Sequence, residues 1–326
     1  MIIGQDRALE QFTGAWDSRK VHHAWLLAGP SGVGKASFAR AAARRVLAEA
    51  AGPPFDLRGL NTPDEHPMVK LIDAGSHPDM RWLERLPREK GEGLARNISV
   101  AQIRDLGQFF TLTPAFSPWR VAVIDTLDEL ESAAANALLK ILEEPPPNTI
   151  FFLVSHAPGR LLPTIRSRCR RLQFEALDDE AMTSILEQEV PTLARPERER
   201  IIAMSGGSAG RAVAFAELDL AKLEDAAGKI MRQGDPTNAL RSDLATELGK
   251  KNAADRYGAF LDVTPSLIAK RARDLTGEPL ERALVAYAKA RELGAVARRL
   301  SLNPSATVFE LCGVLAEVAD PASLKR

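Results

Sequence analysis

The sequence predicts an α/β domain with a largely parallel sheet, followed by two helical segments. Short apolar runs alternate with helical patterns up to about residue 173, the rhythm of parallel strands joined by crossover helices. A glycine-rich turn, GPSGVGKAS (Gly29–Ser37), joins an apolar run to a helical pattern. Beyond residue 178 the spacing of apolar residues is helical throughout. We therefore expect three domains, at residues 1–174, 175–232 and 233–326.

The first segment contains three clear strands and two clear helices. Apolar runs predict strands at Ala24–Gly29, Arg120–Asp125 and Thr149–Ser155. Alanine- and leucine-rich stretches predict helices at Ser37–Ala50 and Glu131–Glu144. Pro145, Pro146 and Pro147 should end the second helix sharply, because proline cannot continue one.

Composition and charge exclude several classes of function. The 43 basic residues balance the 43 acidic residues, so no chain-wide field attracts nucleic acid or an anionic membrane. Cys169 and Cys312 lie far apart and give neither a disulfide framework nor a metal-ligand spacing. No apolar run approaches the length of a membrane span, and the first residues lack the pattern of an export signal. A cytoplasmic protein is therefore expected.

The glycine-rich turn has the features of a nucleotide-phosphate cradle. Gly29, Gly32 and Gly34 let backbone N–H groups turn toward phosphates, and Lys35 can reach the terminal phosphates from the start of a helix. The next position usually carries a hydroxyl that binds Mg²⁺, but here it is Ala36. Ser37 should not replace that hydroxyl, because one helical step rotates the side chain by about 100°.

The strand that ends at Asp125 bears on hydrolysis. In nucleotide-hydrolysing proteins of this kind such an aspartate helps hold magnesium, and a glutamate after it activates water. Asp125 is present, but Thr126 takes the glutamate position. Asp128 and Glu129 are interpreted as solvated carboxylates on the turn into the next helix. Two catalytic positions lack the required groups, so the sequence predicts an inactive site.

A basic stretch, PTIRSRCRRLQF (Pro163–Phe174), carries four arginines in six residues. It fits a solvated loop, a patch for a phosphate backbone, or an arginine that acts in trans on a neighbour's γ-phosphate. Spacing alone leaves all three interpretations open.

Four motifs together resemble the bacterial clamp loaders of DNA polymerase III, AAA+ proteins that open the ring-shaped sliding clamp and close it on primed DNA. These motifs are GPSGVGKA, NALLKILEEPP (Asn136–Pro146), RLLPTIRSRC (Arg160–Cys169) and GGSAGRA (Gly206–Ala212). The resemblance covers essentially the whole chain, from IIGQDRAL through SHPD (Ser76–Asp79) to LNPSATVFELC. It implies a RecA-like AAA+ domain, a helical lid domain and an all-α collar domain for oligomerisation.

The resemblance also assigns roles to particular residues. It implies that Ser167, Arg168 and Cys169 are the family's signature, with Arg168 as the finger that reaches the ATP of an adjacent motor subunit. It places Ser155 at the sensor-1 position and Arg211 at the sensor-2 position.

Contact with DNA is less clearly indicated by the resemblance. It makes Arg104, on the helix that starts near Ser99, a candidate DNA contact. The alternative is an exposed helical arginine that pairs locally.

The resemblance further implies a stator that does not hydrolyse ATP and works in a heteropentamer. Its partners would be the gamma/tau motor subunits, the delta subunit, the sliding clamp and primer-template DNA, with no membrane. No cofactor is required, although the intact Gly32, Gly34 and Lys35 leave weak binding of ATP or ADP open. Two alternatives remain: an active motor of the same family, with Asp128 or Glu129 as base, and a P-loop kinase acting on a small molecule.

The proline-rich and acidic region from Gly52 to Gly75 is expected to be an exposed insertion. Many clamp-loader relatives carry four zinc-binding cysteines in such an insertion, but this chain has none between Val46 and Asp79. His66 and His77 are too few and too far apart to form a closed tetrahedral site, so no zinc is predicted. Both are interpreted as surface or packing residues.

Overall fold

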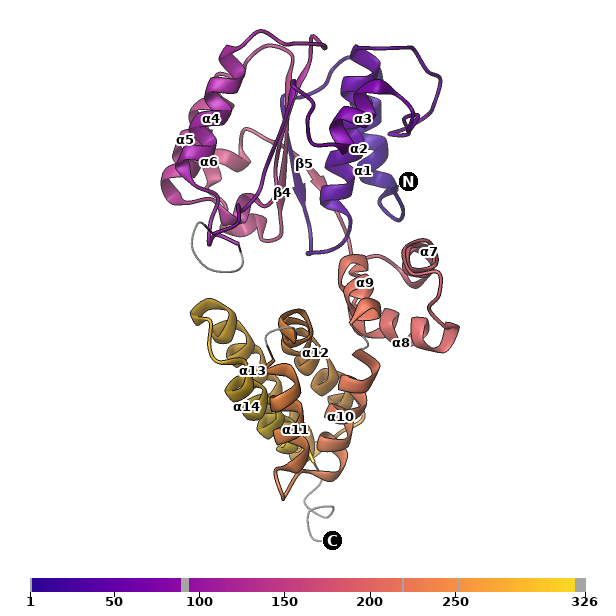
Figure 1. The fold of residues 1–326 in the computed structure, drawn as a ribbon, viewed down its shortest axis with the longest axis vertical. Coiled ribbons are helices and arrows are strands. Elements are labelled where there is room, and N and C mark those ends of the chain that lie inside the picture. Colours follow the sequence, from indigo (N-terminus) through magenta and orange to yellow (C-terminus); the bar gives the residue numbers. More distant parts are fainter. Residues whose placement is uncertain (1, 89–93, 219, 251–252, 320–326) are drawn as a thin grey trace. The chain divides into compact units, whose positions relative to one another are not determined.

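The computed structural model describes residues 2–88, 94–218, 220–250 and 253–319 (Figure 1). The chain divides into two compact units. The first consists of Met1–Met182 and Gly207–Gly210, and the second of Thr183–Gly206 and Arg211–Arg326. The finer division into three domains stays a prediction.

Five parallel strands form the sheet of the first unit, in the order β2-β3-β4-β1-β5. They are β1 (Ala24–Ala28), β2 (Met80–Leu83), β3 (Arg120–Ile124), β4 (Thr149–Ser155) and β5 (Arg170–Gln173). The three strands predicted from apolar runs, β1, β3 and β4, are confirmed, and all of their residues are buried. Burial on both faces is typical of central parallel strands and explains why their sequences are continuously apolar.

Helices cover both faces of this sheet (Figure 1). One face carries α1 (Asp6–Asp17) and α2 (Lys35–Ala50), with α3 (Pro67–Asp73) packed on α2. The other carries α4 (Val100–Thr111), α5 (Ser132–Glu143) and the short α6 (Pro163–Arg166). Single-turn helices η1 (Leu127–Glu129) and η2 (Pro158–Arg160) follow β3 and β4.

The strands contribute side chains to two separate hydrophobic cores, one on each face of the sheet, because successive side chains of a strand point to opposite faces. Trp25 of β1 packs with Phe12 and Phe38 on the first face, and the Phe12 and Trp25 rings lie edge to face at 5.2 Å. Leu26 points to the second face, where it joins Leu138 of α5. The two layers hold β1 between β4 and β5 in the sheet, with its carboxyl end at the glycine-rich loop.

The region from Gly52 to Gly75 is partly buried, whereas the sequence predicts an exposed insertion. Its helix α3 buries Met68, Val69 and Ile72, so the expectation of an exposed insertion is wrong for this part. His66 is 4% exposed and accepts a hydrogen bond from the Met68 N–H at the start of α3. The interpretation of this histidine as a packing residue is confirmed.

The second unit is helical among its described residues. Two of its helices, α7 (Asp179–Glu189) and α9 (Ala209–Glu217), begin in the first unit. The others are α8 (Arg195–Ser205), α10 (Leu220–Gln233), α11 (Ala239–Leu248), α12 (Ala254–Ala272), α13 (Gly277–Leu300) and α14 (Pro304–Ala316). Asn303 caps α14 by accepting the Ala306 N–H at 3.0 Å. None of the helices in the described part of the chain is long and apolar enough to span a membrane.

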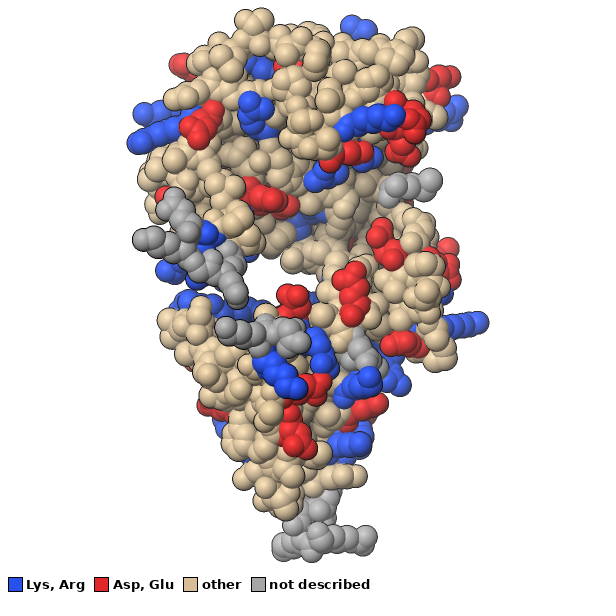
Figure 2. All heavy atoms as spheres, viewed as in Figure 1, with Lys and Arg blue, Asp and Glu red and all other residues tan. Residues whose placement is uncertain are grey.

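Charged side chains of both signs are interspersed over the face drawn in Figure 2. This agrees with the formal net charge of zero.

Candidate functional site

The glycine-rich loop connects β1 to α2 at the carboxyl end of the sheet. Gly32 and Gly34 have positive φ angles of 75° and 94°, which glycine adopts without steric cost. Gly29 lies so close to the end of β5 that a Cβ there would be 2.2 Å from the Phe174 carbonyl oxygen. Helix α2 begins at Lys35, so its first free N–H groups face this loop. The predicted strand, loop and helix are thus all present.

Lys35 does not extend outward from the loop. Its Nζ donates to the Gly29 carbonyl at 2.8 Å and also to the Pro30 carbonyl, and the residue is 3% exposed. Burial lowers the pKa of this amine to about 8, against the opposing attraction of Asp125 and Asp128. The amine that should reach a nucleotide's terminal phosphates is therefore engaged by its own loop.

A second segment of the first unit lies against the tip of the loop. The Gly210 N–H donates to the Gly32 carbonyl at 2.9 Å. A Cβ on Gly210 would be 3.2 Å from the Gly32 Cα, so the two backbones are close to van der Waals contact. The motif GGSAGRA is thus adjacent to the cradle through its glycine.

The magnesium side of the site retains one carboxylate. Ala36, Ser37 and Asp125 line a cavity of about 1010 Å³, and Ala36 offers it only a methyl group. Burial raises the pKa of Asp125, and the Thr126 hydroxyl donates to Asp125 Oδ1 at 3.4 Å. Within the described ranges, no three or more His, Cys, Asp or Glu residues group as metal ligands. These residues fit a magnesium nucleotide poorly.

Asp128 and Glu129 lie on η1, where Asp128 is exposed and Glu129 is partly exposed, but each also has partners within the chain. Asp128 accepts hydrogen bonds from the Ser155 hydroxyl at 2.9 Å and from the backbone N–H groups of His156 and Ala157 at 2.5 and 3.3 Å. Glu129 pairs with Arg85 at 2.8 Å. Asp128 therefore connects the loop after β3 to the end of β4, and Glu129 connects it to the segment after β2.

Ser155 and His156 end β4 beside this cluster. Ser155, the sensor-1 candidate, is fully buried, and its carbonyl accepts the Gly29 N–H at 3.3 Å. His156 Nε2 lies 3.4 Å from the Thr126 hydroxyl, and burial and then Lys35 lower its pKa. Sequence reasoning missed His156, although its place directly after a buried strand was a usable signal.

At the end of α6, Ser167 and Cys169 bond to the backbone of this helix, whereas Arg168 is a partly exposed cation. The Ser167 hydroxyl donates to the Thr164 carbonyl at 3.1 Å, and the Cys169 thiol to the Ile165 carbonyl at 3.1 Å. Burial raises the pKa of Cys169 to about 12, so its thiol stays protonated at neutral pH. The Arg168 side chain is 34% exposed.

The guanidinium of Arg168 is held by two acceptors. Its Nη1 donates to the Thr164 carbonyl at 2.9 Å, and its Nη2 forms an ion pair with Glu143 Oε1 at 2.7 Å. Glu143 belongs to the last turn of α5, within the motif NALLKILEEPP. Sequence reasoning did not identify this pair.

The two remaining predicted site residues are Arg211 and Arg104. Arg211 belongs to the second unit, where it lines a cavity of about 300 Å³ with Tyr287, Arg291 and Arg298. Arg104 is exposed on α4, and no ion pair joins it to another described residue. The alternative of local pairing is therefore not supported for Arg104, and its contact with DNA stays a prediction.

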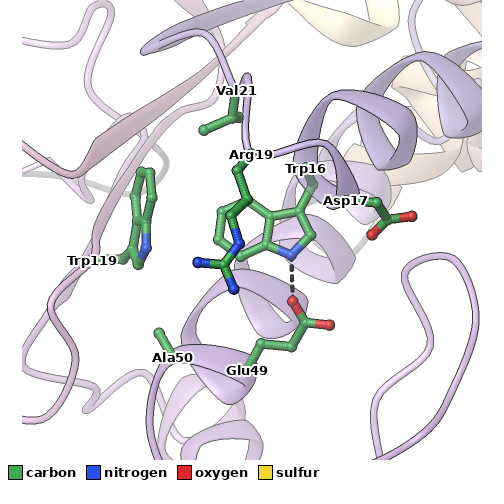
Figure 3. Close-up of a pocket in the computed structure, with 7 residues that line it drawn as sticks. All are labelled: Trp16, Asp17, Arg19, Val21, Glu49, Ala50 and Trp119. Carbon is green, nitrogen blue, oxygen red and sulfur yellow. Dashed lines mark hydrogen bonds between the residues drawn. The ribbon is translucent and has the colours of Figure 1, made fainter.

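A separate cavity of about 420 Å³ lies at the far end of α2 (Figure 3). Trp16 and Trp119 line it with ring centroids 5.3 Å apart, and the Trp16 indole N–H donates to Glu49. Because α2 has 16 residues, its two ends are about 24 Å apart. This cavity is therefore not part of the glycine-rich site.

The strand order and the glycine-rich loop between β1 and α2 define a P-loop α/β protein with the sheet of AAA+ domains. The sequence profile of a family described as DNA polymerase III, delta subunit, matches residues 4–178. The chain belongs to this family, together with relatives named subunit delta'.

Two relatives, a subunit delta' and a subunit tau, support the assignment. The DNA polymerase III subunit delta' of Pseudomonas aeruginosa is 36% identical over 189 residues, which is 57% of this chain and 53% of that protein. Subunit tau of Bacillus subtilis is 30% identical over 264 residues, 78% of this chain and 44% of that protein. The matched regions thus span about half the length of these relatives. The solved structure of a DNA polymerase III gamma subunit-related protein of Thermotoga maritima matches with a TM-score of 0.49 and 17% identity, covering 95% of this chain and 99% of that chain.

Proposed function

We propose that this chain is the stator subunit, delta', of a DNA polymerase III clamp loader. In this role it hydrolyses no ATP itself, helps load the sliding clamp onto primed DNA, and supplies Arg168 to the ATP site of a neighbouring motor subunit. The motor subunits would be gamma or tau, with delta completing the heteropentamer.

The position of the Lys35 amine supports the proposal most directly. A working phosphate loop leaves its lysine to neutralise charge on the terminal phosphates. Here two loop carbonyls already bind that amine, and Ala36 supplies no magnesium ligand beside it. Transfer of a phosphoryl group depends on positioned cations, so the lack of a magnesium ligand at Ala36 weakens the electrostatic stabilisation of the transition state.

The state of Arg168 supports the second half of the proposal. A guanidinium has five N–H donors, and within the chain one of them bonds to the Thr164 carbonyl while Glu143 forms an ion pair with the group. Further donors and a partly exposed face therefore stay available for an anionic group from outside, such as a γ-phosphate.

The alternative of an active motor is less well supported. It requires Asp128 or Glu129 to activate water in place of the missing glutamate. Asp128 accepts three hydrogen bonds and Glu129 is paired with Arg85, so neither is positioned as an open general base.

ATP turnover by the purified chain, with and without primed DNA, tests the stator role. We expect the wild-type chain to release no more phosphate than the Lys35→Ala variant, because the required magnesium ligand and base are absent. Turnover that disappears in Lys35→Ala would show that the chain is a motor and overturn the proposal.

A further inference from the structure

We propose that Glu143 is the positioning residue that holds Arg168 in the orientation it needs to act in trans. This inference rests on the proposed role of Arg168 and adds to it a specific internal partner. The partner comes from a different element, since Glu143 ends α5 whereas Arg168 follows α6.

The geometry fixes one edge of the guanidinium. Glu143 Oε1 forms an ion pair with Nη2 at 2.7 Å, and the Thr164 carbonyl accepts a hydrogen bond from Nη1 at 2.9 Å. A carboxylate at one terminal nitrogen and a carbonyl at the other restrict both the position and the orientation of the group. The remaining N–H donors, including Nε–H, are left for a ligand. A long side chain fixed in this way loses less conformational entropy when it meets a phosphate.

A negative charge at the position of Glu143 disfavours formation of helix α5. Glu143 and Glu144 lie at the carboxyl end of the helix, where the macrodipole disfavours negative charge. The Glu143 side chain is 48% exposed, and ion pairs at such sites contribute little to stability. Neither helix formation nor folding stability therefore explains a carboxylate here, whereas orientation of Arg168 does.

The neighbouring Glu144 provides a matched control. It is exposed, adjacent in sequence, and forms no ion pair with another described residue. Glu143→Gln and Glu144→Gln thus make the same change of charge and size at the same helix end. Only Glu143→Gln weakens the hold on Arg168.

The test is DNA-stimulated ATP turnover by the full complex reconstituted with each variant. We expect Glu143→Gln to lower kcat at least threefold with the KM for ATP unchanged, Arg168→Ala to lower kcat further, and Glu144→Gln to match wild type. In the Arg168→Ala background, Glu143→Gln should have no additional effect, because its influence passes through the arginine. All variants should share the thermal unfolding midpoint of the wild-type chain.

The outcomes separate this inference from the proposed function. If Arg168→Ala leaves turnover unchanged, the finger role itself is wrong and the inference fails with it. If Arg168→Ala lowers turnover while Glu143→Gln matches Glu144→Gln, the finger role stands and the positioning role is overturned. An increase in turnover for Glu143→Gln would also overturn it, because the carboxylate would then be restraining the finger.

Discussion

Lys35 combines a buried amine with two backbone acceptors, and its charge is therefore sensitive to pH near neutrality. Burial lowers the pKa of the folded amine from its ordinary value of 10.5 to about 8. Asp125 and Asp128 face the same amine and oppose this shift. An amine that loses its proton more readily in the folded chain makes folding stability rise with pH between about 8 and 10.5, since the unfolded chain binds more protons there.

The free energy of unfolding should therefore increase more steeply with pH in the wild-type chain than in Lys35→Met. Between pH 7 and pH 9 the expected difference is about 1 kcal/mol. Urea unfolding followed by tryptophan fluorescence measures it, because the four tryptophans of the chain all lie in the first unit. Parallel pH profiles for the two proteins would contradict a lowered pKa for Lys35.

For individual residues, the sequence predicted which chemical groups the site lacks better than it predicted which partners its side chains contact. Ala36 and Thr126 are visible as missing groups, because a hydroxyl or carboxylate is either encoded or not. The direction of the Lys35 amine depends on the rotamer chosen among nearby carbonyls. The partners of Asp128 and Arg168 belong to elements that are distant in sequence, so no local sequence pattern predicts these contacts.

Strands and helices were predictable where one environment dominates a whole element. Strands β1, β3 and β4 are buried on both faces and read as continuous apolar runs. The edge strands β2 and β5 were missed, because exposed residues such as Arg81, Arg170 and Arg171 interrupt their apolar pattern. These two segments are strands because they pair with β3 and β1, and such pairing cannot be read from the local sequence.

The close packing of the ends of β1 and β5 requires a glycine at position 29, because there is no room for a Cβ atom. A methyl group there would meet the backbone of Phe174 at 2.2 Å, and backbone cannot move aside as a flexible side chain can. We expect Gly29→Ala to destabilise the first unit by about 2–3 kcal/mol in urea unfolding followed by tryptophan fluorescence. Gly159→Ala is the control, since no atom lies within 4 Å of its added Cβ. Equal midpoints for both variants would show that β5 can shift to accommodate the methyl group.

Across the whole molecule, balanced charge limits how the chain meets DNA. With 43 basic and 43 acidic residues, no general field draws a polyanion to it. Contact must depend on a few local cations that no acidic neighbour neutralises. Arg104 meets this condition on α4, since it is exposed and forms no ion pair within the described part of the chain.

Arg104→Ala in the reconstituted complex should weaken binding of primed DNA at every sequence tested. If one phosphate contact is lost, the slope of log affinity against log salt concentration falls by about 1. Lys140→Ala is the charge-matched control, because Lys140 is also exposed and lies on α5, which packs beside α4. Salt titrations with both variants distinguish a specific contact from a change in net charge. Arg104 contacts no phosphate if its variant keeps the wild-type affinity and slope, and the effect is one of general charge if both variants lose affinity equally.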